Sequence, residues 1–217
     1  MKMKQLSLTA FSMVVISASS ATFAQTENFT GLSVGANFTQ TAATHKRTET
    51  DSSSVEVFKY GETSSGANLQ AAYGFKAGDS MVINVGGTYS LNDYKAGGHS
   101  YSQTSYDLIG KDKKHYTLYI EPGFVLSDST LAYGKLAYHN LTHEVKATSS
   151  NTSLNESIKF SNIGFGAGVR TMLSKNTFLQ AEMGLVNFTE KSYVHGGATF
   201  KEQPKLTYGS LGVGYKF

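Results

Sequence analysis

The feature that most restricts the fold of this chain is an alternation of apolar residues with small or polar residues in eight separate segments. Alternation with a period of two is typical of β-strands that present one face to an apolar environment. The eight segments are residues 30–39, 67–75, 81–91, 116–124, 131–139, 162–171, 177–185 and 206–217.

The connections between these segments alternate in length. Residues 76–80, 126–130 and 174–176 are tight turns rich in Gly, Asp, Asn and Ser, whereas the other four connections are long and polar. Short turns at one end and long loops at the other are typical of an outer-membrane barrel, and an even strand number returns both termini to the periplasm. We expect four mobile external loops at roughly residues 40–65, 92–113, 140–159 and 188–204.

The composition agrees with strands that cross a membrane. The chain has 22 glycines but 2 prolines, together with 13 tyrosines and 13 phenylalanines, a balance that favours strands over disorder. A mean hydropathy of −0.24 is too polar for a helical membrane protein. Strands need only ~9 to 11 tilted residues to span a bilayer. We therefore predict an all-β fold, an eight-stranded antiparallel up-and-down transmembrane barrel.

The N-terminal segment is predicted to be a secretory signal peptide. Two lysines precede an apolar run from Leu6 to Ile16, and Thr22 and Ala24 are the small residues of a cleavage site. We expect removal of residues 1–24, which leaves residues 25–217 as the barrel domain. Removal takes away two lysines and no acid, so the formal net charge of +3 falls by two, and the composition does not support a basic nucleic-acid surface.

Several stretches resemble the small outer-membrane barrels of Gram-negative bacteria, in the group of opacity-type surface antigens and OmpA-like transmembrane domains. They are GFGAGVR at residues 164–170, LGVGYKF at 211–217, and YIEPGF and TLAYGKLAYH at 119–124 and 130–139. The resemblance covers the whole chain after the signal peptide. It implies a fold and an outer-membrane location rather than an activity.

The resemblance also implies a role for the last strand. In such proteins a final strand that ends in Phe is read by the periplasmic and outer-membrane assembly machinery, which makes Val213, Tyr215 and Phe217 the expected assembly signal. The residue pattern agrees, because alternation places these three side chains on the lipid side, with the two aromatic rings at the periplasmic interface.

Four charged residues fall on the inward side of the predicted strands, namely Glu121, Lys135, Arg170 and Glu182. A turn centred on Asp128 places Glu121 opposite Lys135, and the next short turn makes Arg170 and Glu182 diagonal neighbours. One interpretation is a plug of salt bridges in an interior only wide enough for side chains. The other is a gate, in which Glu121 exchanges between Lys135 and Arg170 and opens a narrow water path.

The six histidines map to the expected loops or to the outer ends of strands. In the predicted register His115 and His139 are inward neighbours with His143 just above, and three histidines could bind a divalent metal or sense pH. The alternative is that polar residues gather where water is, and we expect no metal and no cofactor. The six are His45, His99, His115, His139, His143 and His195.

Two further interpretations concern the outer end of the barrel. His139, His143 and Glu144 could belong to a lipid A-modifying enzyme, but no motif identifies a nucleophile. Several basic residues of the expected loops could hold lipopolysaccharide phosphates. They are Lys46, Arg47, Lys111, Lys113 and Lys114.

We therefore expect a surface or envelope protein, not an enzyme, with a plugged interior and external loops that act in adhesion, surface contact or envelope integrity. The expected partners are outer-membrane lipid and lipopolysaccharide, the barrel-assembly machinery during biogenesis, and a host or environmental surface ligand. Nucleic acid is not an expected partner. The alternatives are a narrow gated ion channel and a lipid A-modifying enzyme.

Overall fold

The computed structural model describes residues 26–52, 54–101, 106–148, 153–195 and 197–217, so the predicted signal peptide lies outside the described residues. No helix in this part of the chain is long and apolar enough to cross a membrane. The described elements are η1 (Thr26–Phe29), β1 (Gly31–Thr50), β2 (Val55–Lys76), β3 (Met81–Ser90), β4 (Tyr94–Tyr101), β5 (Tyr106–Ser127), β6 (Thr130–Thr148), β7 (Ser153–Met172), β8 (Thr177–Asn187), β9 (Lys191–His195) and β10 (Ala198–Lys216).

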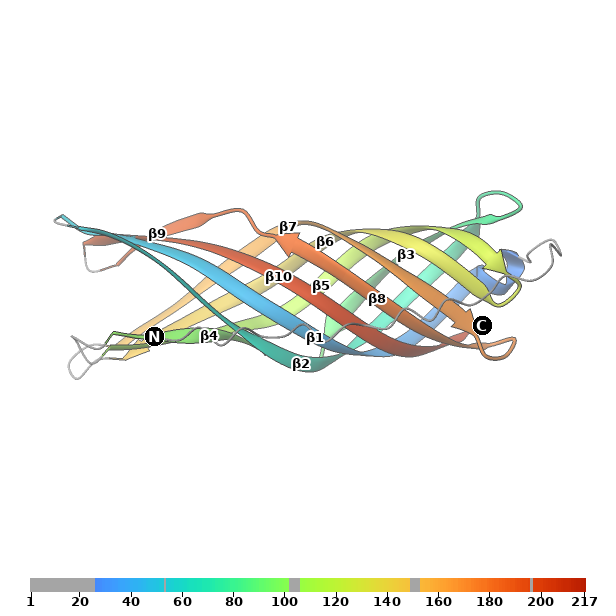
Figure 1. Ribbon diagram of the computed structural model, residues 1–217, viewed down its shortest axis with the longest axis horizontal. Coiled ribbons are helices and arrows are strands. Elements are labelled where there is room, and N and C mark those ends of the chain that lie inside the picture. Colours follow the sequence, from blue (N-terminus) through green and yellow to red (C-terminus); the bar gives the residue numbers. More distant parts are fainter. Residues whose placement is uncertain (1–25, 53, 102–105, 149–152, 196) are drawn as a thin grey trace.

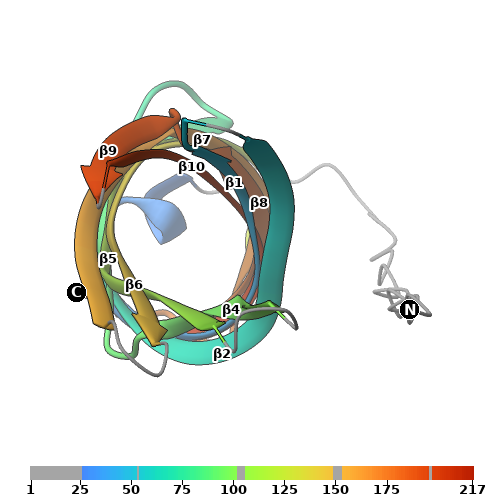
Figure 2. The same ribbon diagram turned by 90° about the vertical axis from the view of Figure 1, so that its left-hand side faces the viewer.

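Eight of the described strands close into a barrel (Figure 1 and Figure 2). Antiparallel pairing runs in the order β1, β2, β3, β5, β6, β7, β8 and β10, and β1 pairs with β10 to complete the ring. This closing seam is long, from Ser33 opposite Lys216 to Thr50 opposite Thr199. Of the two short strands, β4 pairs with β5 and β9 pairs with β10. The predicted eight-stranded antiparallel barrel is confirmed.

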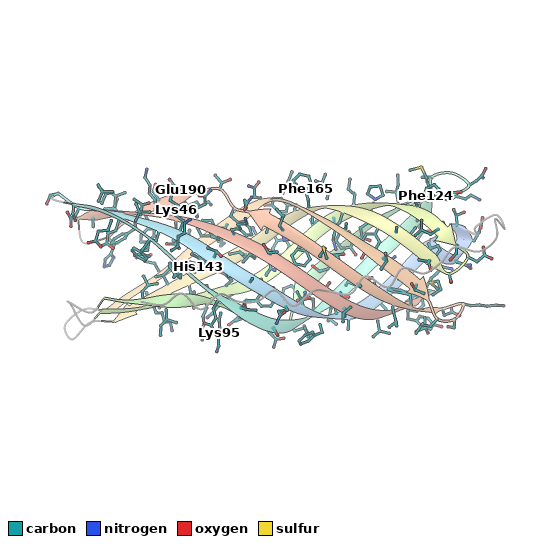
Figure 3. The ribbon with its side chains drawn as sticks, viewed as in Figure 1. Lys46, Lys95, Phe124, His143, Phe165 and Glu190 are labelled. Atoms are coloured by element: carbon teal, nitrogen blue, oxygen red, sulfur yellow. The ribbon has the colours of Figure 1, made fainter. Side chains whose placement is uncertain are left out.

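A belt of outward, mostly apolar side chains surrounds the barrel next to its tight turns. Phe38, Phe165 and Phe217 in this belt are 61%, 63% and 67% exposed, and Figure 3 shows Phe124 and Phe165 pointing away from the barrel. Apolar residues outside with small or polar residues inside are the pattern of a barrel in lipid. The apolar belt comprises the outward side chains of residues 32–38, 69–75, 81–91, 116–126, 132–138, 163–173, 179–185 and 211–217.

The barrel wall continues well beyond the apolar belt, and the expectation of four long loops is wrong. β1 and β2 pair with each other as far as Thr50 and Val55, so only residues 51–54 connect them. β6 and β7 likewise pair as far as Thr148 and Ser153. Many outward side chains of this extended wall are polar, as is typical of a sheet face exposed to water, so the composition of these strands resembles that of a loop.

A β-bulge in β5 changes which of its side chains face the interior. Between Lys113 and Tyr116 the pairing with β6 includes one extra residue of β5, and Lys114 there has a positive φ of 50°. Bulges re-aim side chains in this way. Beyond the bulge the even-numbered residues face inward, so Asp112 lies inside the barrel and opposite His143.

The short helix η1 closes the barrel at the end that carries the tight turns. Phe29 is 4% exposed and packs with inward side chains of three strands, Val82, Val125, Leu131 and Tyr133. Figure 2 shows η1 inside the outline of the ring. The lumen is therefore filled by an apolar cluster at this end.

Inward glycines make room for tyrosine rings on the neighbouring strands. A Cβ at Gly168 would lie 2.5 Å from Tyr133 Oη and 2.5 Å from the carbonyl oxygen of Ala181. Both distances are far inside van der Waals contact, and the carbonyl belongs to the backbone, which cannot rotate away. Three direct cross-strand pairs follow this pattern, namely Tyr119 opposite Gly86, Tyr133 opposite Gly168, and Tyr208 opposite Gly184.

The substitution Gly168→Ala is expected to lower the free energy of unfolding by about 1–3 kcal/mol, the usual effect of overpacking an interior. The measurement is urea unfolding of the refolded barrel in detergent, followed by its heat-modifiable gel migration. Gly134→Ala is the control, because a Cβ there meets nothing within 4 Å, and its effect is expected to stay within about 0.5 kcal/mol. Equal effects of the two substitutions would contradict this account.

Candidate functional site

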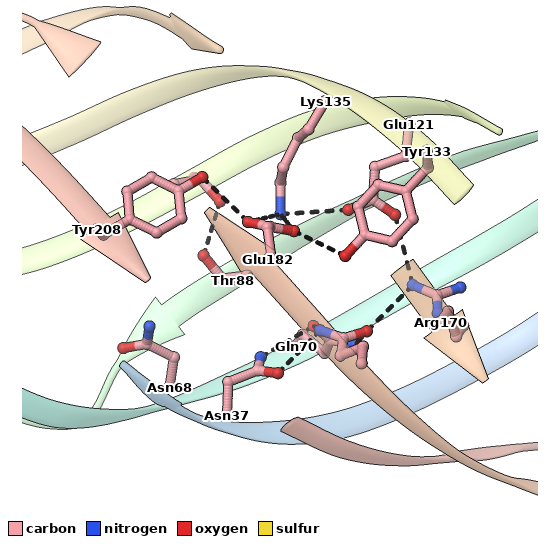
Figure 4. A network of polar contacts seen from close by, with 12 residues as sticks. Asn37, Asn68, Gln70, Thr88, Glu121, Tyr133, Lys135, Arg170, Glu182 and Tyr208 are labelled. Atoms are coloured by element: carbon pink, nitrogen blue, oxygen red, sulfur yellow. Dashed lines mark hydrogen bonds and ion pairs between the residues drawn. The ribbon is translucent and has the colours of Figure 1, made fainter. Parts of the chain in front are cut away.

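The four inward charged residues lie together inside the apolar belt and form an interior charge network (Figure 4). Lys135 Nζ lies 2.9 Å from Glu182 Oε2 and 3.2 Å from Glu121 Oε1. Arg170 Nη2 lies 3.4 Å from Glu121 Oε2. Glu121 therefore contacts both cations at once. The register that the sequence predicted between Glu121 and Lys135 is the one observed on either side of this pair.

Arg170 and Glu182 are diagonal neighbours, as predicted, because Glu182 lies opposite Gly168. The guanidinium of Arg170 nevertheless has other partners, since Nη2 donates to Gln180 Oε1 at 3.3 Å as well as to Glu121. Gln180 is directly opposite Arg170 on β8, and direct cross-strand neighbours are closer than diagonal ones. Glu182 is left to the ammonium group of Lys135.

Neutral side chains complete the hydrogen bonding around the buried charges. Tyr133 and Tyr208 donate their hydroxyl protons to Glu182 at 3.1 and 3.0 Å, and Lys135 Nζ lies 3.9 Å from the centre of the Tyr119 ring. Buried charges are tolerated when hydrogen bonds and opposite charges satisfy them in this way. Alternation predicts these rings inside the barrel, but their hydrogen bonds depend on cross-strand register.

Amide side chains extend the network to the closing seam. Gln180 Nε2 donates to Gln70 Oε1 at 2.7 Å and to Asn37 Oδ1 at 2.8 Å. Through Gln180 the charge network is joined to β1 and β2, as Figure 4 shows. The interior of the belt is therefore one connected polar layer.

Replacement of Lys135 by Met is expected to lower the free energy of unfolding by about 3–5 kcal/mol, because buried Glu182 loses its cation and Glu121 keeps only Arg170. Urea unfolding in detergent measures this effect. Lys159→Met serves as the control, since Lys159 is exposed on the outer face of β7 beyond the belt, and a change within about 0.5 kcal/mol is expected there. A loss no greater than that of the control would mean that the network does not stabilise the barrel.

A second polar cluster lies inside the extended wall, beyond the apolar belt. His45 of β1, Asp112 of β5 and His143 of β6 are fully buried; we call these three residues the outer histidine cluster. His143 Nδ1 lies 2.7 Å from Asp112 Oδ1, and His45 Nε2 lies 3.5 Å from Asp112 Oδ2. The two imidazole rings stack with their centroids 4.2 Å apart, so both present a nitrogen to one carboxylate.

The other ring nitrogen of each histidine faces a further oxygen atom. His45 Nδ1 lies 3.4 Å from Glu202 Oε1, and His143 Nε2 lies 3.2 Å from Tyr60 Oη. Tyr60 in turn donates its hydroxyl proton to Glu202, and Arg47 Nη1 lies 3.5 Å from Glu202 Oε2. The cluster and its surroundings therefore join β1, β2, β5, β6 and β10.

The two carboxylates of this region favour a positive charge on His45, which lies between them. Burial alone would lower the pKa of His45, but Asp112 and Glu202 raise it to about 9. Burial would raise the pKa of Asp112, but His143 and His45 hold it below its ordinary value. Opposite charges within hydrogen-bond distance outweigh desolvation here.

These contacts correct the expectations for the outer end. His45, assigned to a loop, and Arg47, assigned to lipopolysaccharide phosphates, both lie inside the barrel, and Arg47 is only 1% exposed. His143 does not join the other two histidines of the considered metal site, because it faces Asp112. His115 Nε2 and His139 Nδ1 lie 3.1 Å apart. The paired strands and the β5 bulge produce this arrangement, and neither is visible as alternation in the sequence.

The residues considered for a lipid A-modifying enzyme do not converge. His139 and His143 face the interior, whereas Glu144 faces outward and forms an ion pair with Lys113 at 2.6 Å. Successive residues of a strand point to opposite faces of the sheet, so His143 and Glu144 cannot share a site.

The last strand places the expected assembly residues on the outer face. Val213, Tyr215 and Phe217 are all exposed in the apolar belt, and the rings of Tyr215 and Phe217 meet edge to face with centroids 5.2 Å apart. They stand on the β10 side of the closing seam. Their role as an assembly signal stays a prediction.

Above the charge network the interior contains a small polar cavity and then an apolar layer. The cavity of about 40 Å³ is lined by the network residues Lys135 and Glu182 on one side and by His115 and His139 on the other. It has room for ~3 water molecules. The apolar layer consists of the buried side chains Ala43, Leu141, Phe160, Val186, Phe188 and Leu206.

Comparison with known proteins identifies the fold. The family model of the outer membrane protein beta-barrel domain matches residues 9–217. The outer membrane protein OprG from Pseudomonas aeruginosa is similar in structure, with 13% identity over 87% of this chain and 96% of that chain and a TM-score of 0.57. At this identity the likeness concerns the fold alone.

Two further solved structures are similar at lower scores. The attachment invasion locus protein Ail of Yersinia pestis, solved with the heparin analogue sucrose octasulfate, is 17% identical over 84% of this chain and 99% of that chain, with a TM-score of 0.45. The outer membrane protease OmpT from Escherichia coli is 10% identical over 86% and 96%, with a TM-score of 0.47. None of the curated proteins is significantly similar to the chain in sequence.

Proposed function

Since the chain belongs to the outer membrane protein β-barrel family, we propose that it is a Gram-negative outer-membrane surface protein that acts by contact. The observation that carries this proposal is the filled interior. The described side chains occupy the lumen at three levels, which are the Phe29 cluster, the charge network, and the apolar layer with the outer histidine cluster. In this proposal the turn end, which carries Thr26 and Phe217, faces the periplasm, and the extended wall faces outward.

The outer surface of the extended wall supplies a basic contact area. Lys46 of β1 lies directly opposite Lys59 of β2, and Lys205 of β10 lies opposite Thr44, two residues from Lys46. All three lysines are exposed, and Figure 3 shows Lys46 on this part of the barrel. Like charges directly opposite destabilise a sheet, so a bound anion would stabilise it. We propose lipopolysaccharide phosphates as that anion, and an acidic host or environmental ligand could use the same surface.

The double substitution Lys46→Gln and Lys59→Gln is expected to weaken lipopolysaccharide binding at least about fivefold, which corresponds to ~1 kcal/mol for the two exposed charges. Co-sedimentation of the refolded protein with lipopolysaccharide vesicles measures the affinity. The matched control replaces Lys175 and Lys216 at the turn end, which removes the same charge. If both pairs weakened binding equally, the basic surface of the extended wall would not be the contact area.

The assembly role of the last strand is part of the proposal. Val213, Tyr215 and Phe217 would be read by the barrel-assembly machinery before the seam closes. Their common outward face supports this, because it leaves the three side chains accessible on an unpaired strand.

A narrow gated channel is the second candidate, and one observation favours it. Glu121 contacts Lys135 and Arg170 at the same time, so a small movement of its side chain could break one ion pair and keep the other. This exchange would take place beside the polar cavity. The filled lumen predicts instead that the folded protein shows no discrete openings in a planar bilayer. Discrete openings that change with Glu121→Ala or Lys135→Ala would reject the closed barrel and establish the channel.

A further inference from the structure

The outer histidine cluster brings metal-ligating atoms together from three strands. One ligand atom each of His45, Asp112 and His143 lies within 4.8 Å of the others, and all three residues are buried. Two imidazole nitrogens and a carboxylate oxygen are the donor types that zinc-like divalent ions bind. β1 does not pair with β5 or β6, so the three donors meet across the lumen rather than along one sheet edge.

Two buried atoms that face each other in this cluster have no hydrogen-bond partner among the described residues. They are His45 Nε2 and Asp112 Oδ2, which lie 3.5 Å apart. Without an ion His143 Nδ1 donates to Asp112 Oδ1, and a bound metal ion would displace that proton. Tyr60 donates its own proton to Glu202, so its oxygen can accept one from His143 Nε2.

The same contacts match the outer partners of metal-bound histidines. Such histidines usually donate their second ring N–H to a carboxylate or another oxygen acceptor, which fixes the ring and its tautomer. Glu202 Oε1 is placed to accept a proton from His45 Nδ1, and Tyr60 Oη is placed to accept one from His143 Nε2. Arg47 then holds the second oxygen of Glu202.

The charge of the region leaves a place for a cation at His45. Asp112 and Glu202 carry two negative charges and Arg47 supplies one positive charge, so the second positive charge comes either from a proton on His45 or from a metal ion that takes its place. An uncompensated charge in a buried cluster is costly. We propose that the outer histidine cluster binds one zinc-like divalent ion through His45 Nε2, His143 Nδ1 and Asp112, a site that is independent of the contact function proposed above.

The proposal is tested with the untagged full chain, refolded in detergent with excess Zn²⁺ and separated from free metal by gel filtration against a weak chelator. Elemental analysis of the folded, heat-modifiable form is expected to find one zinc ion per chain. Asp112→Asn and His143→Ala are expected to retain less than about a tenth of that amount, since each removes a ligand. His195→Ala is the matched control, because His195 is exposed and pairs with Glu156, and it is expected to keep the full amount.

Two results would overturn the proposal. Folded wild-type protein without zinc would mean that two ring protons, rather than a metal ion, hold the cluster. Equal zinc in wild type and Asp112→Asn would place the metal elsewhere. If the variants do not fold, the visible spectrum of wild type loaded with Co²⁺ decides, because bands of a histidine-ligated cobalt ion support the site and their absence rejects it.

Discussion

The closed ring of backbone hydrogen bonds is the constraint on which the rest of the structure depends. In lipid every N–H and C=O group must find its partner within the protein, and a barrel does this only when its first and last strands pair. Here β1 and β10 pair over the whole length of the seam, from the apolar belt to the outer end. Because the ring stays closed beyond the belt, the wall continues outward as paired strands, and both the charge network and the outer histidine cluster lie in one continuous lumen.

A narrow lumen then determines which side chains can be inside. Eight strands leave room for side chains only, so large rings need small neighbours and charges need partners. Tyr133 lies against Gly168 and donates to Glu182, which shows both requirements at one position. The polar groups that fill the belt are therefore coupled, since Lys135 joins Glu182 to Glu121 and Glu121 joins Arg170. This coupling makes the interior a stabilising element, whether or not it also opens.

The sequence predicted the barrel, its strand number, the inward charges and the Glu121–Lys135 register, because these depend on alternation and on short turns. It did not predict the extended wall. Outside lipid, outward residues such as Lys46 and Lys59 are polar and inward residues such as His45 are polar too, so the period of two disappears. The bulge at Lys114 shifts the parity of β5, and only this shift brings Asp112 to His143. Contacts across the lumen also join strands that are not neighbours in the sheet. A local pattern in the sequence cannot predict such contacts.

The most direct test of this account is amide hydrogen exchange of the refolded protein in lipid, resolved over residues 40–50 and 55–65. If β1 and β2 pair as described, these amides exchange as slowly as those of residues 32–38 in the belt, because opening them requires breaking the wall. Exchange as fast as that of an unfolded peptide would mean that the two segments are loops. In that case the extended wall, the buried cluster within it and the outer contact surface would all be contradicted.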